Sequence, residues 1–186
     1  MFRAYVDESE PFGVPNSYIM AAALVEDEDA ESVRHLVSKL KPKRHKKLHW
    51  NEEPSDSRLM IATTLSNCRL VHVVVVRTGV PGDRPERRRR HCLERLAYEL
   101  HLFGITSITA EARDGASNRR ELEYLNRMRS AQRISSALRL HHVPGPGEPL
   151  LWIADAVAGA VGISRRPDGT SEYVDCFDGM IQIVDM

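Results

Sequence analysis

The chain has 186 residues, of which 42% are hydrophobic, and its 26 basic and 26 acidic residues give a formal net charge of zero. This length and composition suit one globular domain with a hydrophobic core and argue against a collagen-like, disordered or membrane-spanning protein. The longest apolar stretch, residues 151–163, is interrupted by Asp155 and is too short to cross a bilayer. Any attraction for polyanions must therefore come from local basic runs and not from the net charge.

The N-terminal residues and the cysteines indicate the cellular location and the redox state to expect. The N-terminal residues enter a hydrophobic strand without a charged segment and apolar signal core, so we expect a cytoplasmic protein. Cys68, Cys92 and Cys176 are widely spaced and form no CxxC pair. Buried free thiols are therefore expected, and a zinc knuckle or disulfide framework is not.

Hydrophobic periodicity and turn residues predict alternating strands and helices along the chain. The expected strands are residues 3–7, 17–25, 69–77, 105–112 and 136–142. The expected helices are residues 30–40, 55–67, 85–103, 118–130 and 149–163, followed by a tail with a short helix and a short strand at 181–184. Proline and glycine clusters at 11–15, 79–85 and 144–149 are typical of loops, so residues 1–186 are expected to form a single domain.

Apart from a helical insertion at about residues 30–67, this order is β-β-β-α-β-α-β-α. It matches the ribonuclease H-like architecture, an α/β fold with a central five-stranded mixed sheet and helices on both faces. In that architecture the first and fourth strands are neighbours, and adjacent strands lie about 4.8 Å apart. Carboxylates at the ends of these two strands could therefore reach one cation.

Three acidic residues occupy apolar elements. Asp7 ends the first strand, Glu111 ends the fourth, and Asp155 lies inside a helix of small residues. Burying a carboxylate is costly unless it is paired or bound to a cation, and oxygen ligands favour Mg²⁺ or Mn²⁺. Small residues at Ala158 and Gly159 would let the last helix approach the sheet and bring Asp155 to the strand ends. The alternative is that Asp155 only hydrogen-bonds a loop.

Basic residues near these carboxylates suggest where phosphates could bind. The run at 41–47 contains the candidate phosphate ligands Lys43, Arg44, Lys46 and Lys47, and a second run at 84–90 contains Arg87. Arg113 has the strand parity of Glu111 and could face the same crevice. Solvated loops and a local ion pair of Arg113 are the alternative interpretations.

Two more side chains follow the first basic run. His49 could shuttle protons as an acid or base, and Trp50 could stack on a nucleobase. Alternatively, both pack the inserted helices against the sheet. Glu8, next to Asp7, points to the opposite face of a regular strand, so a structural contact is expected for it.

The sequence also resembles a known family. Residues 5–9, Tyr-Val-Asp-Glu-Ser, resemble the opening YxDESG motif of the bacterial and phage family called domain of unknown function 3800, and residues 153–160 resemble its closing (L/I)AD-x-(V/I)-(A/x)-G motif. The resemblance implies a ribonuclease H-like nuclease with Asp7 and Asp155 as matching acidic positions, Glu111 as the third, and an association with phages or mobile elements. Glu10 replaces the family's glycine, so the turn must form without glycine's freedom at positive φ.

These observations predict a Mg²⁺- or Mn²⁺-dependent nuclease or phosphodiesterase acting on nucleic acid, with DNA and RNA left open. Asp7, Glu111 and Asp155 would hold the metal. The alternative is a non-catalytic nucleic-acid-binding or protein-interaction module with the same fold. No membrane association is expected, and the apolar tail at 180–184 could pair with an edge strand of a second copy in a homodimer.

Overall fold

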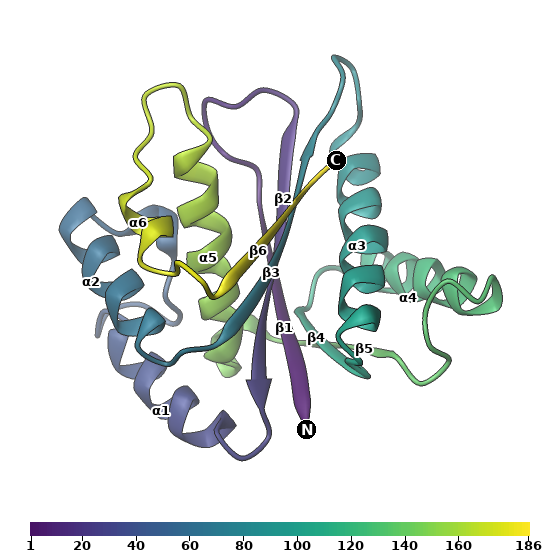
Figure 1. Cartoon of the computed structure of the whole chain (residues 1–186), viewed down its shortest axis with the longest axis horizontal. Coiled ribbons are helices and arrows are strands. Elements are labelled where there is room, and N and C mark those ends of the chain that lie inside the picture. The colour runs from purple at the N-terminus through teal and green to yellow at the C-terminus, as the bar shows by residue number, and fades with distance from the viewer.

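The computed structural model describes all 186 residues, and its framework is a six-stranded mixed sheet (Figure 1). The strands are β1 (Phe2–Ser9), β2 (Ser17–Glu26), β3 (Val71–Thr78), β4 (Ser107–Glu111), β5 (Arg139–Val143) and β6 (Ile181–Asp185). Their spatial order is β5-β4-β1-β2-β3-β6. The strand β2 is antiparallel to β1 and β3, and the other neighbouring pairs are parallel. The expected adjacency of the first and fourth strands is therefore present.

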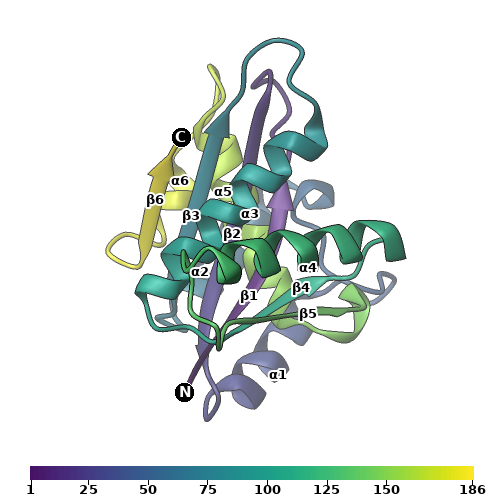
Figure 2. The same ribbon diagram turned by 90° about the vertical axis from the view of Figure 1, so that its right-hand side faces the viewer.

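Helices cover both faces of this sheet (Figures 1 and 2). The helices α3 (Pro85–Leu102) and α4 (Gly115–Ser130) lie on one face. The other face carries α1 (Ala30–Leu40), α2 (Ser55–Ser66), α5 (Leu150–Ser164) and α6 (Glu172–Asp175). Two short 3-10 turns, Trp50–Glu52 and Gly145–Gly147, lie in the connections. None of the helices combines the length and hydropathy that a membrane span requires.

The sheet separates two hydrophobic cores, and alternation along each strand decides which side chains enter which core. On β1, Ala4 and Val6 enter the core under α3 and α4, whereas Tyr5 enters the core under α5. The run Val73 to Val76 on β3 is buried throughout, with alternate valines in the two cores. This agrees with the expectation that a continuous apolar strand is covered on both faces.

The sixth strand is the main difference from the expected five-stranded sheet. The tail strand β6 pairs in parallel with β3 of the same chain, with Val74 opposite Ile183. This pairing satisfies one edge of the tail strand and leaves its other edge at the border of the sheet. Homodimer formation remains a prediction.

The turn between β1 and β2 accommodates Glu10 without strain at that position. Its positive φ angles occur later, at Gly13 (81°) and Asn16 (59°). The Glu10 carboxylate accepts a 3.0 Å hydrogen bond from the Arg88 guanidinium on α3. The glycine missing from the YxDESG-like motif is therefore not needed to form this turn.

Helix ends show a smaller set of differences. The helix α4 begins at Gly115, three residues before the expected start, because the Asp114 side chain accepts from the backbone N–H groups of Ala116 and Ser117. At α2 the N-cap position is Pro54, and no side chain caps this end of the helix.

Candidate active site

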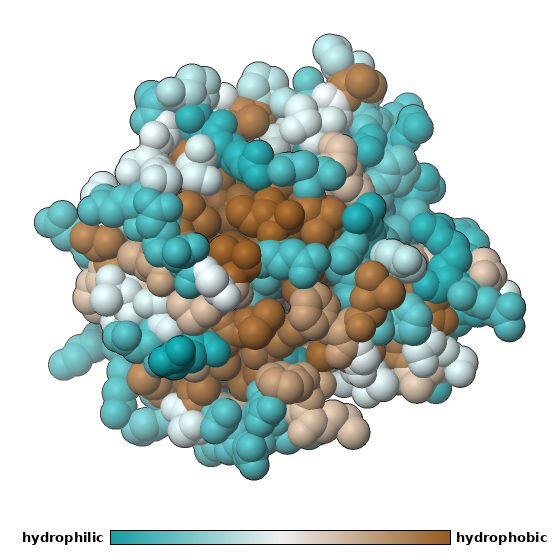
Figure 3. Space-filling view, viewed as in Figure 1, coloured by the Kyte–Doolittle hydropathy of each residue, from teal (hydrophilic) through white to brown (hydrophobic).

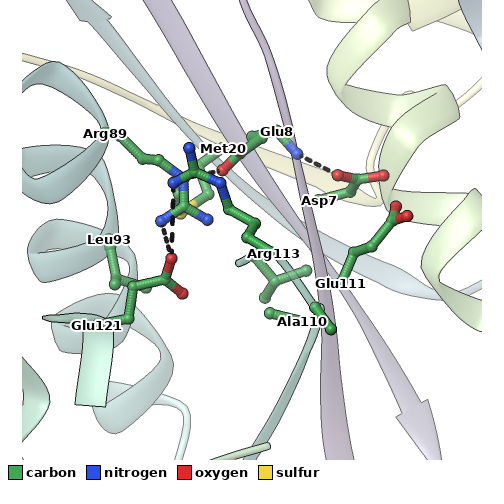
Figure 4. Close-up of a pocket in the computed structure, with 11 residues that line it drawn as sticks. Asp7, Glu8, Met20, Arg89, Leu93, Ala110, Glu111, Arg113 and Glu121 are labelled. Carbon is green, nitrogen blue, oxygen red and sulfur yellow. Dashed lines mark hydrogen bonds and ion pairs between the residues drawn. The ribbon is translucent and has the colours of Figure 1, made fainter. Parts of the chain in front are cut away.

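The parallel register of β1 and β4 brings two of the predicted carboxylates together. Val6 lies opposite Ala110, so Asp7 and Glu111 follow side by side at the carboxyl ends of the two strands. Both alternate with residues of the α3–α4 core and therefore face α5. Figure 4 shows the two carboxylates turned to the same side, away from Arg89 and Glu121. The open end of adjacent central strands is where α/β sheets commonly place their ligands.

Asp155 reaches this place from α5, and each of the three carboxylates has one hydrogen-bonded anchor. The Glu8 backbone N–H donates to Asp7 Oδ1 at 2.8 Å, and the Trp50 backbone N–H donates to Asp155 Oδ2 at 3.0 Å. The Lys47 ammonium donates to both oxygens of Glu111, at 3.0 and 2.7 Å. The second oxygen of Asp7 and of Asp155 accepts no hydrogen bond from the protein.

Negative charge at this site is only partly compensated. Burial raises the pKa of Asp7 well above its usual value, and the nearby carboxylates of Asp155 and Glu111 raise it further. Burial also raises the pKa of Asp155, against the opposing effects of the Trp50 N–H, Lys47 and His49. Of the three carboxylates only Glu111 has an ion pair, which leaves two half-buried aspartates without a counter-charge.

The donor chemistry at this site suits a hard divalent cation, although the side chains are not arranged around one. Carboxylate oxygens from Asp7, Glu111 and Asp155 are the ligands that Mg²⁺ and Mn²⁺ prefer. The three side chains do not converge into a cluster able to hold a metal ion, and Glu111 is ion-paired with Lys47. Binding of one cation by all three carboxylates would therefore require side-chain rotation and the release of Glu111 by Lys47.

Glycines next to the site make room for functional side chains. A Cβ at Gly145 would lie 2.2 Å from Glu111 Oε1, so the Glu111 carboxylate lies directly over this backbone. A Cβ at Gly159 would lie 2.1 Å from the Trp50 ring. The small residues of α5 were expected to let this helix lie close to the sheet. At Gly159 they also make room for the Trp50 ring.

The prediction that Trp50 stacks on a base is wrong. Its side chain is 0% exposed and packs edge-on against Tyr173, with ring centroids 5.4 Å apart. The alternative role, packing the inserted segment against α5, is the one that the structure shows. His49, the residue before it, is half-buried and close enough to Asp155 to affect the charge of that carboxylate.

Of the basic run at residues 41–47, only the last residue, Lys47, contacts one of the three carboxylates. Lys47 contacts Glu111, whereas Lys43, Arg44 and Lys46 are exposed and have no ion pair. They remain candidate phosphate ligands.

A second group of charged residues lies on the opposite face of β1. The Arg89 guanidinium pairs with Glu8 at 2.5 Å and with the buried Glu121 (Figure 4). His142 lies 2.9 Å from Glu121. Glu8, Arg89 and Glu121 line a cavity of about 180 Å³ whose lining also includes Asp7 and Glu111. The expectation of a structural contact for Glu8 matches this placement.

Two predicted phosphate ligands belong to that opposite face. Arg113 pairs with Glu86 at 2.8 Å and lies 3.9 Å from Glu121, because β4 ends at Glu111 and strand alternation does not continue to residue 113. The Arg113 side chain thus points away from the Glu111 carboxylate, but it lines the same cavity as Asp7 and Glu111, and its role as a phosphate ligand stays a prediction. Arg87 is exposed on α3, 3.6 Å from Asp83, and contacts none of the three carboxylates.

Sequence reasoning missed Arg89 and Glu121. Arg89 lies within four consecutive arginines, of which Arg88 and Arg89 are buried. The helical positions of the apolar residues Cys92, Leu93 and Leu96 would have placed residues 88 and 89 on the buried side of α3.

Comparison with known proteins identifies the fold. No protein-family model matches the sequence, and no curated protein is significantly similar to it. The RNase HII in the PCNA:RNase HII complex from Archaeoglobus fulgidus has a TM-score of 0.51 and 16% identity, over 85% of this chain and 71% of that chain.

Two structures of Bst-RNase HIII are also similar to this chain. A mutant form has a TM-score of 0.56 and 14% identity, over 89% of this chain and 54% of the other. The complex with Mn²⁺ has a TM-score of 0.50 and 14% identity, over 88% and 52%. This chain thus spans about half the length of the RNase HIII chains. These likenesses confirm the predicted ribonuclease H-like α/β fold, with a sixth strand added at one edge.

Proposed function

We propose that this protein is a divalent-metal-dependent nuclease whose active site is formed by Asp7, Glu111 and Asp155. One observation carries the proposal: three carboxylates from β1, β4 and α5 lie near one another at the end of the central strands, with Lys47 as their one ion-paired cation. The ribonuclease H-like fold supports it, as does a similar enzyme solved with Mn²⁺. Mg²⁺ or Mn²⁺ is the proposed cofactor, and nucleic acid is the proposed substrate.

The chain's own residues have separable roles in this proposal. Asp7 and Asp155 would hold the cation through the oxygens that lack hydrogen bonds, and Glu111 would join them when Lys47 moves away. The bound metal would activate water and stabilise the leaving oxygen. Lys47, once released, can neutralise a substrate phosphate, and His49 beside Asp155 can carry a proton.

Cleavage of a labelled panel tests this function. The panel contains single- and double-stranded DNA, RNA and RNA–DNA hybrid, each with Mg²⁺, Mn²⁺ or EDTA. Wild type is expected to cut at least one substrate only with metal, and Asp7→Asn is expected to lose about 10³-fold or more of the rate. Asp56→Asn, an exposed aspartate on α2, is the matched control and should cut normally. An unchanged rate in Asp7→Asn would sink the site assignment.

A non-catalytic binding module is the second candidate function. The observation in its favour is that Lys47 forms an ion pair with Glu111 and the three carboxylates do not converge. A thermal melt with and without Mn²⁺ separates the candidates, because a cation that binds the folded state stabilises it by RT ln(1 + [L]/Kd). Nucleic-acid binding with neither cleavage nor a metal-dependent shift would favour the module.

A further inference from the structure

The arginines of this chain are concentrated on one side of the molecule. Residues 84–139 contain 13 arginines and no lysine against seven acidic residues. The rest of the chain holds 13 basic and 19 acidic residues, so the zero net charge conceals two halves of opposite sign. The basic half forms α3 and α4, which cover the same face of the sheet (Figure 2).

Many of these arginines are not used in ion pairs. Arg84, Arg119, Arg127 and Arg133 are exposed and have no carboxylate within 4.0 Å, and Arg120 bonds only to the Ser117 hydroxyl. The margin of Figure 3 that corresponds to α3 and α4 is mostly hydrophilic. The excess positive charge is therefore presented to solvent.

An organised groove lies between the two helices. It has a volume of about 390 Å³ and is lined by Glu86, Arg87, Arg90 and Tyr124. The guanidinium of Arg90, from α3, lies 5.7 Å from the centre of the Tyr124 ring, and that of Arg127, from α4, lies 4.8 Å from it. Tyr124 therefore holds one arginine from each helix beside the groove. We call Glu86, Arg87, Arg90 and Tyr124, together with the adjacent Arg127, the arginine groove.

The arginine groove is connected to the candidate active site through α3. Arg89, next to Arg90, pairs with Glu8, and the Glu8 N–H holds Asp7. The two surfaces are thus on opposite faces of the sheet but at the same end of β1. A polyanion in the arginine groove would extend toward that end.

We propose that the arginine groove binds the phosphate backbone of a nucleic acid outside the catalytic carboxylates. Arginine recognises phosphate through a planar fork of donors and stacks on aromatic rings, as it does on Tyr124. An acidic protein fits less well, because protein interfaces need a buried apolar core and the groove lining contains no apolar residue besides Tyr124. The inference extends the proposed function, but it concerns binding and can succeed or fail without cleavage.

Fluorescence anisotropy tests the proposal in a background that cannot depend on the metal site. The parent protein is Asp7→Asn in EDTA, and the probes are labelled single- and double-stranded oligonucleotides and a poly-glutamate peptide of equal charge. The groove variant combines Arg87→Gln, Arg90→Gln and Arg127→Gln. The control combines Arg3→Gln, Arg69→Gln and Arg165→Gln, which removes the same charge from exposed positions elsewhere. Thermal melts check that both variants fold.

The groove variant is expected to bind oligonucleotide on the order of tenfold more weakly at 0.1 M salt. Its slope of log K against log [salt] should fall in magnitude by about 2 to 3, since each phosphate contact contributes about 0.9 on a duplex. The control should bind like the parent. Equal weakening of the two variants, or no weakening of the groove variant, would overturn the proposal. Tighter binding of the poly-glutamate peptide than of the oligonucleotides would assign the groove to an acidic protein instead.

Discussion

The two faces of the sheet both carry carboxylates beside the end of β1, and they differ in how that charge is balanced. On the α3–α4 face, Glu8 and Glu121 share the buried guanidinium of Arg89. On the α5 face, Asp7 and Asp155 have no ion pair, and Lys47 reaches only Glu111. The balanced group ties β1 to two helices, whereas the unbalanced group has spare oxygens for a ligand. The difference separates carboxylates that hold the fold together from those available for chemistry.

Removing Arg89 tests the balanced face and should give the largest change in stability. Arg89→Met leaves Glu8 and the 3% exposed Glu121 without their guanidinium. Breaking a buried pair by removing one partner costs about 3–5 kcal/mol of unfolding free energy. Urea denaturation measures this loss. Adding Glu8→Gln and Glu121→Gln to the same protein should restore part of it, and a loss below about 1 kcal/mol would show that the group is not structural.

Asp7→Asn tests the unbalanced face and should act in opposite directions with and without metal. In EDTA the variant is expected to melt higher than wild type, because it removes one of three mutually repelling carboxylates. With Mn²⁺ it is expected to lose the metal-dependent rise in Tm that wild type shows. Each kcal/mol corresponds to about 2–4 °C in a chain of this size. A lower Tm in EDTA would contradict the proposed repulsion.

The same pair of proteins should diverge with pH. The folded-state pKa of Asp7 is raised above its usual value of 3.8, so its favourable contribution is complete below that value and is lost as pH rises through the folded pKa. In EDTA, wild type should therefore lose stability relative to Asp7→Asn as pH rises from about 4. Urea midpoints for both proteins from pH 3.5 upward measure the difference. A constant difference across this range would mean that Asp7 has an ordinary pKa.

Lys47→Gln tests whether the ion pair between Lys47 and Glu111 competes with a metal. Lys47 lies 2.7 Å from Glu111 and also lowers the pKa of Asp155. Without it the metal-free protein should be destabilised by up to about 1 kcal/mol, a typical upper value for a partly exposed pair. Mn²⁺ should bind more tightly, because Glu111 is free. Isothermal titration measures the affinity, and weaker Mn²⁺ binding would show that Lys47 supports the site.

Most of the fold could be predicted from the sequence because its periodicity is strong where it matters. The bounds of α1 coincide with the predicted residues, and the valine run of β3 indicated a strand covered on both sides. The pairing of β6 with β3 could not be predicted, since a five-residue strand carries no information about which edge it joins. The cap at Asp114 could have been predicted, because an aspartate before a helix commonly accepts hydrogen bonds from the first backbone N–H groups of that helix.

Some features of the candidate site follow from the order of the strands, and others depend on side-chain packing. Asp7 and Glu111 are brought together by the adjacency of β1 and β4, which the element order implies. The alternation rule failed for Arg113 because it holds only while the strand continues, and β4 ends two residues earlier. Burial of Trp50 depends on the space that Gly159 leaves, and no local pattern around Trp50 indicates it.

His72 is a smaller test of the α5 face, because it is another polar group buried there without a partner. Its ring is 0% exposed, lies 5.3 Å from Phe177, and makes no hydrogen bond through either nitrogen. Burial lowers its pKa from 6.5 to about 4. Between those two values the unfolded chain binds a proton that the folded chain does not, so wild type should lose stability as pH falls from 6.5 to 4.

His72→Phe should remove that part of the pH dependence and stabilise the protein by about 1 kcal/mol near neutral pH, where an unsatisfied buried polar group still carries a cost. The exposed His35, changed to Gln, is the control and should leave the pH dependence as in wild type. Urea midpoints at pH 5 and pH 7 distinguish the two. Equal slopes in wild type and His72→Phe would mean that burial does not lower the pKa of His72 in the folded protein.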